Sequence, residues 1–215
     1  MRIRDLMSTN VVTVRLDDKV SEVLHMMNMK KIRRVPIVEN GKVVGIVTTT
    51  DMDRVSPSDA TTLSKYELIY LWSKVTVKDA LPRYQKLITI GPDQYIEEAA
   101  QLMNEHHIGA LPVMEKDQLV GIITETNIFN GLIKLMQVKK THTRIDIRVE
   151  DKIGTLADIT NQFTKANKNL LNSVVYEEND SHLYRLIFRI EGHDTDDIVN
   201  ELRKKYEVVA TKKLS

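Results

Sequence analysis

The segment Gly45-Ile46-Val47-Thr48-Thr49-Thr50-Asp51 returns 76 residues later as Gly121-Ile122-Ile123-Thr124-Glu125-Thr126-Asn127. In each copy, a β-branched run predicts a buried strand that ends at a threonine. Asp51 and Asn127 follow three positions later, where either side chain suits the start of a helix. This junction gathers a hydroxyl, an acidic or amide side chain and free helix N–H groups, which suits a sugar that carries a phosphate. Helix capping alone also explains a single copy.

The surrounding residues recur at the same offset. Residues 11–14 and 87–90 predict short apolar strands, and Asn40-Gly41 between two apolar runs predicts a hairpin with a type I′ turn. Apolar residues with helical spacing follow each predicted strand: Val20, Val23, Leu24 and Met27 in the first copy, and Ile96, Ala99, Ala100 and Met103 in the second. Recurrence of strand, helix and hairpin at one fixed offset indicates a duplicated supersecondary unit.

The composition of the chain is that of a soluble globular protein. Of its 215 residues, 42% are hydrophobic and 28% are charged, and the formal net charge is +1. That balance gives no electrostatic reason to expect a nucleic-acid or membrane partner. Because there is no cysteine, disulfides, thiol catalysis and cysteine metal sites are excluded. The N-terminal residues lead into no apolar segment, so we expect a cytoplasmic protein.

The periodicities divide the chain into four parts. We expect repeat one at residues 1–55, a linker helix at 56–75, repeat two at 76–137, and a different domain at 141–215. In the linker, Ser64-x-x-Glu67 has the form of a capping box. Trp72 follows on the same predicted helix, either as a brace packed against the repeats, which we favour, or as part of a partner-binding surface.

Beyond Lys139-Lys140-Thr141 the pattern changes. Ile145, Ile147 and Val149 alternate as in a strand, and the later segments complete the order βαββαβ. This order predicts a ferredoxin-like antiparallel sheet with helices on one face. The expected fold class is therefore α/β and α+β, with a tandem repeat pair followed by a ferredoxin-like domain.

With these residues laid out, the tandem units resemble CBS domains. The resemblance rests on both copies of the Gly-to-Asp/Asn segment, on Val35-Pro36-Ile37-Val38 and on Asp5-Leu6-Met7. The C-terminal segment resembles an ACT domain through Asp151-x-x-Gly154-x-Leu156-Ala157 and its element order. The order CBS-CBS-ACT in so short a chain is similar to that of the acetoin-utilisation B family of non-catalytic regulatory proteins.

The resemblance implies two clefts in the CBS pair, of a kind that commonly binds adenosine nucleotides. In the first cleft, Asp51 would hold the ribose and Thr48 a ribose or phosphate oxygen. Arg34 would bind phosphate, although Arg33 and Arg34 also fit a solvated face. The residues assigned to nucleotide binding in this cleft are Val11, Val12, Ile32, Arg34, Thr48 and Asp51. The expected ligand is AMP, ADP, ATP or another adenosine derivative, and no cofactor is expected.

A second, weaker cleft is assigned to His107, Thr124 and Asn127. Asn127 offers one neutral oxygen where the first copy has a carboxylate, and hydrogen bonds to charged acceptors are roughly twice as strong. Both copies carry threonine, Thr50 and Thr126, where many nucleotide-binding members have arginine, which argues against tight triphosphate binding.

In the ACT-like segment, Asp151, Gly154 and Leu156 form a candidate ligand loop for an amino acid. Ile153 replaces the proline usual in that family, and Gly154 equally fits a simple turn. We therefore favour dimerisation, through the exposed sheet or an edge strand, as the role of this segment.

Three functions follow from these observations. The first is a regulatory protein that senses an adenosine nucleotide and acts through a homodimer or on an unidentified protein partner. The alternatives are a structural dimerisation module with vestigial clefts, or amino-acid sensing through the ACT-like domain. An enzyme is not expected, because no nucleophile, acid–base pair or nucleotide-hydrolysing motif can be assembled. The six histidines lack metal-ligand spacing, so no metal site is expected.

Overall fold

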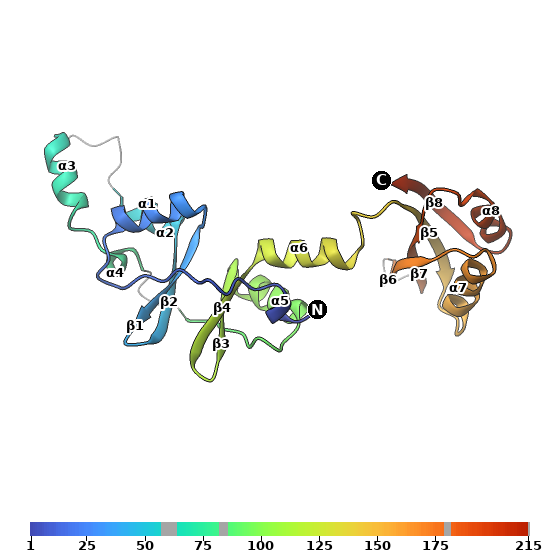
Figure 1. Cartoon of the computed structure of the whole chain (residues 1–215), viewed down its shortest axis with the longest axis horizontal. Coiled ribbons are helices and arrows are strands. Elements are labelled where there is room, and N and C mark those ends of the chain that lie inside the picture. The colour runs from blue at the N-terminus through green and yellow to red at the C-terminus, as the bar shows by residue number, and fades with distance from the viewer. Residues whose placement is uncertain (57–63, 82–85, 179–181, 215) are drawn as a thin grey trace. The chain divides into compact units, whose positions relative to one another are not determined.

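The computed structural model describes residues 1–56, 64–81, 86–178 and 182–214 (Figure 1). The chain divides into two compact units, Met1–Gly131 and Leu132–Ser215. The first unit holds both copies of the repeat, and the second holds the C-terminal segment with the different periodicity. Residues 57–63 of the predicted linker lie outside the described part of the chain.

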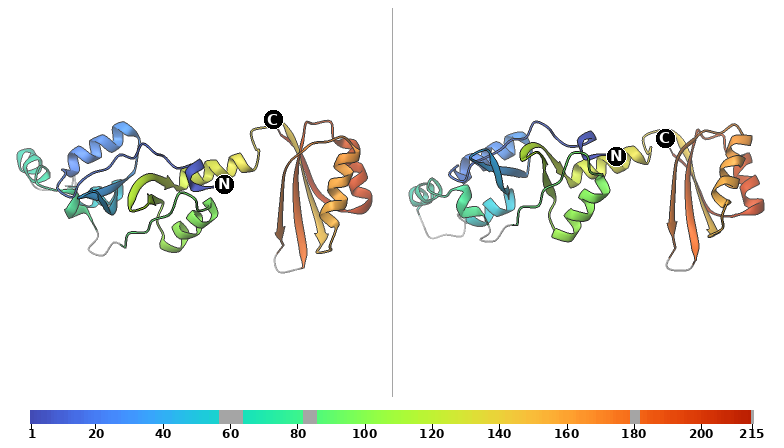
Figure 2. Two further views of the ribbon diagram at one scale, coloured as in Figure 1. Left: turned by 60° about the horizontal axis from the view of Figure 1, so that its bottom comes forward. Right: turned by 90° about the horizontal axis from the view of Figure 1, so that it is seen from below.

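Each repeat consists of a helix, an antiparallel hairpin and a second helix. The elements of the first repeat are α1 (Val20–Lys30), β1 (Arg34–Glu39), β2 (Lys42–Thr48) and α2 (Thr49–Val55). Those of the second are α5 (Ile96–His106), β3 (Ala110–Glu115), β4 (Gln118–Thr124) and α6 (Glu125–Leu135). The two hairpins are neighbours inside the unit through β2 and β4 (Figure 2).

The predicted type I′ turn is confirmed, since Asn40 and Gly41 have φ angles of 49° and 78°. At the matching turn, Lys116 and Asp117 take φ angles of 47° and 64° without any glycine. Both hairpins also carry a register shift at the same place, after Ile37 and after Val113. The duplication therefore extends to backbone geometry that the sequence of the second turn does not signal.

The predicted strands at residues 11–14 and 87–90 are wrong. Val14 forms a single bridge with Ile37, and Ile90 forms one with Val113. Both residues are buried, at 5% and 3% exposure. Val11 and Val12, and likewise Leu87 and Ile88, pair with no strand and instead line two cavities described below. Each apolar run therefore supplies one core residue and part of a cavity wall. Periodicity alone does not distinguish such a run from a strand.

The segment that leads into each repeat packs on the other repeat. Ile3, in the 3₁₀ helix η1 (Ile3–Asp5), is fully buried in the core of the second repeat, and the N-terminus lies beside α5 in Figure 1. Val77, in the short helix α4 (Val77–Ala80), is fully buried in the core of the first repeat. Backbone hydrogen bonds hold both segments, from Ile3 N to Gln94 O (2.9 Å) and from Val77 N to Asp18 O (2.9 Å).

The helix between the repeats, α3 (Lys65–Trp72), begins with the predicted capping box. Glu67 accepts hydrogen bonds from the Ser64 hydroxyl (2.6 Å) and backbone N–H (2.8 Å). The hydroxyl bond contributes most to the lowered pKa of Glu67. The expectation that Trp72 packs as a brace is wrong, because Trp72 is 37% exposed, and Tyr66 on the same helix is 86% exposed. A helix-forming pattern fixes the helix but does not say which neighbour covers it.

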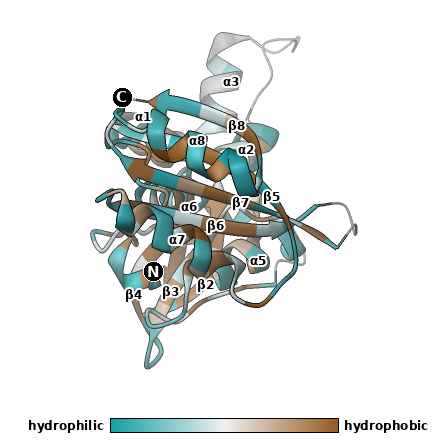
Figure 3. Cartoon of the chain, turned by 90° about the vertical axis from the view of Figure 1, so that its right-hand side faces the viewer, coloured by the Kyte–Doolittle hydropathy of each residue, from teal (hydrophilic) through white to brown (hydrophobic). Residues whose placement is uncertain are grey.

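The second unit confirms the predicted βαββαβ order. Its elements are β5 (His142–Glu150), α7 (Thr155–Lys165), β6 (Leu170–Glu177), β7 (Leu183–Glu191), α8 (Asp196–Lys205) and β8 (Glu207–Leu214). The strands form one antiparallel sheet in the order β6-β7-β5-β8, with both helices on one face (Figure 2). The hydropathy colours in Figure 3 show mixed faces on α7 and α8, as expected for half-buried helices.

The core of this unit is self-contained. Phe163 on α7 and Phe188 on β7 are buried and stack edge to face with their centroids 5.1 Å apart. The other buried core residues come from the same sheet and helices, whereas the buried core residues of the first unit all lie at or before Ile128.

We predict that residues 1–137 fold without the second unit, because every core residue of the repeat pair lies inside that range. The fragment should be soluble and show a cooperative thermal transition by circular dichroism, within a few degrees of one transition of the full chain. An insoluble fragment, or one without a cooperative transition, would show that the units depend on each other for folding.

Candidate functional site

The Thr48–Asp51 corner is built as a capping box where β2 ends and α2 begins. Asp51 Oδ2 accepts hydrogen bonds from the Thr48 hydroxyl (2.7 Å) and the Thr48 backbone N–H (3.0 Å). In return, the Asp51 N–H donates to Thr48 Oγ1 (3.2 Å). Asp51 Oδ1 accepts from Arg54 Nη2 (2.6 Å), and the Arg54 side chain is 61% exposed. One carboxylate oxygen is thus committed to the cap, and the other holds an exposed, exchangeable arginine.

The Thr124–Asn127 corner repeats this cap with an amide. Asn127 Oδ1 accepts from the Thr124 hydroxyl (2.6 Å) and backbone N–H (2.9 Å), and the Asn127 N–H donates to Thr124 Oγ1 (3.4 Å). The three bonds match those of Asp51 one for one. The NH₂ group of Asn127 takes no part in the cap, so this corner presents a hydrogen-bond donor where the first presents a carboxylate oxygen.

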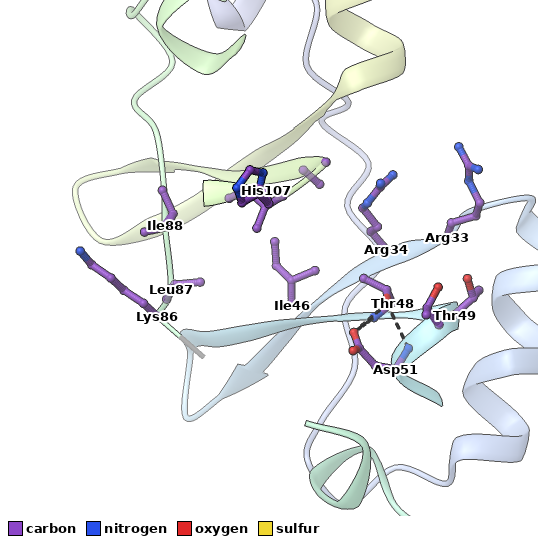
Figure 4. A pocket seen from close by; sticks show the side chains of 14 residues that line it. Arg33, Arg34, Ile46, Thr48, Thr49, Asp51, Lys86, Leu87, Ile88 and His107 are labelled. Carbon is purple, nitrogen blue, oxygen red and sulfur yellow. Dashed lines mark hydrogen bonds between the residues drawn. The ribbon is translucent and has the colours of Figure 1, made fainter. Parts of the chain in front are cut away.

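A cavity of about 420 Å³ opens at the first corner (Figure 4). Thr48 and Asp51 form one side, and Lys86, Leu87 and Ile88 approach on a separate segment that comes from the second repeat. The remaining lining residues continue these two sides: Arg33, Arg34, Ile46, Thr49, Thr50, His107, Ile108, Gly109 and Ala110. Each side therefore comes from a different repeat.

A second cavity of about 330 Å³ has the reciprocal construction. Thr124 and Asn127 of the second repeat face Val11, Val12 and Ile32 of the first. The other lining residues are Ser8, Asn10, Lys31, Arg33, Arg34, Pro36, Ile122 and Thr126. The two cavities are thus related by exchange of the repeats, and most of their residues correspond through the offset of 76.

This geometry corrects the grouping of the predicted site residues. Val11, Val12 and Ile32 were assigned to the cleft of Asp51 but line the cavity of Asn127, and His107 was assigned to the second cleft but lines the first cavity. The structure does bring Thr48 together with Asp51, and Thr124 with Asn127. The grouping failed because the residues were collected within each repeat, whereas each cavity draws on both.

Sequence reasoning missed Lys86, Leu87, Ile88 and Ile108 as residues of the first site. Three of them correspond to residues predicted to bind the nucleotide: Leu87 to Val11, Ile88 to Val12 and Ile108 to Ile32. Applying the offset of 76 to the selected residues would have found all three. Lys86 corresponds to Asn10 and carried no such signal.

The two cavities differ in charge. Arg33, Arg34 and Lys86 line the first together with one carboxylate, Asp51. Lys31, Arg33 and Arg34 line the second, and its described lining includes no carboxylate. Both cavities therefore favour an anionic group, and the first also has a carboxylate acceptor for hydroxyl groups.

The candidate loop of the second unit is open to solvent. Asp151, Gly154 and Leu156 are all exposed, and Gly154 has φ +91° with no atom near the position of a Cβ. Over the described ranges of the chain, no group of three or more His, Asp or Glu side chains is placed to hold a metal ion. Within the same ranges, no helix is both long and apolar enough to cross a membrane.

Comparison with known proteins identifies the family. The CBS domain family matches residues 3–58 and 77–134, which together are more than half of the chain. The chain therefore belongs to the CBS-domain family and carries a CBS pair. The match does not include the C-terminal unit, whose likeness to an ACT domain remains a prediction.

Individual relatives agree with this assignment. A CBS domain-containing protein of Dictyostelium discoideum is 28% identical over 148 residues, covering 63% of this chain and 93% of that protein. A structure described as an acetoin utilization protein (AcuB) from Vibrio cholerae is 28% identical, with a TM-score of 0.52, covering 65% of this chain and 95% of that one. The homoserine O-acetyltransferase of Methanococcoides burtonii is 35% identical over 133 residues, but the match spans 24% of the enzyme's length.

The two corners predict a matched pair of stability effects. Thr48 is the N-cap of α2, and Asp51 completes the capping box from the third helical position. Asp51→Ala and Asn127→Ala each remove the side-chain acceptor of one box and should lower the free energy of unfolding by about 1 kcal/mol. Asp51→Asn should leave it nearly unchanged, because Asn127 makes the same three bonds in the sister corner. Urea denaturation of the unliganded protein measures all three. A loss in Asp51→Asn as large as that in Asp51→Ala would show that the carboxylate charge, not the cap, stabilises the corner.

Proposed function

We propose that this chain is a non-catalytic regulatory protein whose CBS pair binds an adenosine nucleotide. The observation that carries the proposal is the combination of apolar, polar and cationic side chains that line the first cavity. Leu87, Ile88 and Ile108 give an apolar wall for a planar base, Thr48 and Asp51 give a polar corner for a sugar, and cationic side chains line the same cavity. A volume of about 420 Å³ suits a small-molecule site, for which about 300–1,000 Å³ is typical. Members of the CBS family are generally regulatory rather than catalytic.

In this proposal Asp51 keeps its cap while it binds the ribose. Oδ2 stays with Thr48, and Oδ1 exchanges the exposed Arg54 for a ribose hydroxyl. That exchange costs little, because the Arg54 end of the pair is 61% exposed and returns to water when it is displaced. The cap and the ribose role therefore do not compete for the same oxygen.

The second cavity takes the same class of ligand with a different balance of contacts. Three cationic side chains favour the phosphate, while Asn127 offers an amide instead of a carboxylate to the sugar. We therefore expect weaker discrimination for ribose there than in the first cavity.

The second unit serves in this proposal as an ACT-like dimerising module, and the whole chain as an acetoin-utilisation-B-like regulator. The likeness to the Vibrio cholerae protein, of which 95% is covered, supports the second assignment. For the first, β6 is an edge strand of the sheet and exposes Val175 (48%) and Tyr176 (47%). An edge strand with exposed apolar side chains is suited to pairing with another chain.

The binding role of Asp51 is tested by calorimetry with AMP and adenosine. Asp51→Asn should weaken binding at the first cavity by about tenfold or more, because an amide is a poorer acceptor for ribose hydroxyls. Asn127→Asp is the matched control and should leave the first cavity unchanged. Unaltered AMP affinity in Asp51→Asn would refute the ribose role. Failure of the parent protein to bind any adenosine compound would refute the proposed function.

The oligomeric proposal is tested by light scattering coupled to gel filtration. The parent chain should have the mass of a dimer at micromolar concentration. Tyr176→Lys should shift it toward the monomer, because a lysine on an edge strand opposes pairing. Lys204→Ala, on the exposed side of α8, is the control. A monomeric parent would contradict the proposal.

A further inference from the structure

Arg34 lies at the beginning of β1 and lines both cavities of the CBS pair. Its Nη2 donates to Oε2 of Glu125 (3.2 Å), the first residue of α6. The Arg34 side chain is 27% exposed and that of Glu125 is 53% exposed. One guanidinium from the first repeat is therefore anchored to the second repeat between two sites that both favour anions.

Gly109 makes room for this pair. A Cβ at Gly109 would lie 2.1 Å from Arg34 Nη2 and 2.4 Å from Glu125 Oε2, distances that real atoms do not reach. The backbone beside the pair is tied as well, by a hydrogen bond from Glu125 N to Gly109 O (3.2 Å). A residue with a side chain at position 109 would displace the guanidinium from this place.

The pair also breaks the correspondence between the repeats. Arg33 and Arg34 occupy the positions of Gly109 and Ala110, and Glu125 occupies that of Thr49. If the two repeats were equivalent, the second repeat would have an arginine at the position that matches Arg34. That position is Ala110. The two corresponding cavities therefore share Arg33 and Arg34, which have no arginine counterparts in the second repeat, and Arg34 is the one held by Glu125.

We propose that Arg34 couples the two cavities negatively, so that a phosphate bound in one lowers the affinity for a phosphate in the other. This inference rests on the proposed function and adds its regulation. A guanidinium turned to a phosphate in one cavity no longer donates to one in the other, and the second phosphate also brings like charge toward the first. By linkage, each site weakens the other by the same factor.

The size of the coupling follows from the bond that is lost. A hydrogen bond to a charged group contributes enough for about a tenfold to hundredfold change in affinity. A phosphate gains less than this full bond from Arg34, because it must first displace Glu125, whose side chain is 53% exposed. We expect AMP in one cavity to weaken AMP in the other about tenfold.

The test measures AMP binding to each cavity alone and compares it with AMP binding to the parent chain. Thr50 and Thr126 are exposed and line the first and second cavity respectively, so Thr50→Trp and Thr126→Trp each fill one cavity. Calorimetry on each variant gives the AMP affinity of the cavity left open. In the parent chain, the overall association constant for two AMP molecules should be about tenfold smaller than the product of those two association constants. For adenosine, which has no phosphate, the two should be equal.

A second set of variants assigns the coupling to its residue. In Arg34→Met the association constants for two AMP molecules should become independent of each other. Arg33→Met removes the same charge from the lining of the same two cavities, but Arg33 is exposed and the Arg34–Glu125 pair is left in place, so this variant should retain the coupling. Multiplicative AMP constants in the parent chain, or coupling that survives Arg34→Met, would overturn the inference while the proposed function stands. Binding of AMP to one cavity alone would overturn it too. If no variant or parent binds adenosine or AMP, both proposals fail.

Discussion

The burial of Ile3 in the second repeat, and of Val77 in the first, determines how the CBS pair is assembled. Each of these side chains is fully covered by the core of the repeat that it does not lead. Neither repeat then completes its core with its own leading segment. Removing a buried isoleucine side chain costs about 2–5 kcal/mol, so the exchange is a substantial term beside the total stability of a domain.

Exchange of the leading segments places the chain beyond them against the opposite repeat. Ser8, three residues after the end of η1, pairs with Ile122 of β4 through two backbone hydrogen bonds of 3.0 Å. Val11 and Val12 follow and line the cavity of Thr124 and Asn127. The composition of both cavities therefore follows from core packing, and each cavity is sensitive to the relative placement of the two repeats. A ligand that touches both repeats would favour one arrangement of them over others, which is the thermodynamic requirement for a sensor.

Much of the fold could be predicted from the sequence because its signals are local. The Asn40-Gly41 turn, the Ser64–Glu67 capping box and the βαββαβ order each depend on residues close together in the chain, and all three are present. The exposure of Trp72 could not be predicted, since it depends on what lies beside α3.

The candidate site could be predicted in part for the same reason. Thr48 and Asp51 are three residues apart and form their corner by local hydrogen bonds, as do Thr124 and Asn127. The partners across each cavity are brought there by the exchange of segments, a long-range event with no local signal. The role of Gly109 is also invisible in the sequence, because it depends on an arginine and a glutamate 91 residues apart.

The packing of each leading segment on the opposite repeat is tested most directly by hydrogen–deuterium exchange mass spectrometry on Ile3→Ala. The substitution leaves a cavity where Ile3 packs, and protection reports local stability segment by segment. The loss of protection should be larger in peptides from residues 96–124 of the second repeat than in peptides from residues 20–48 of the first. A larger loss of protection in residues 20–48 would contradict the packing of Ile3 on the second repeat, and with it the construction of both cavities.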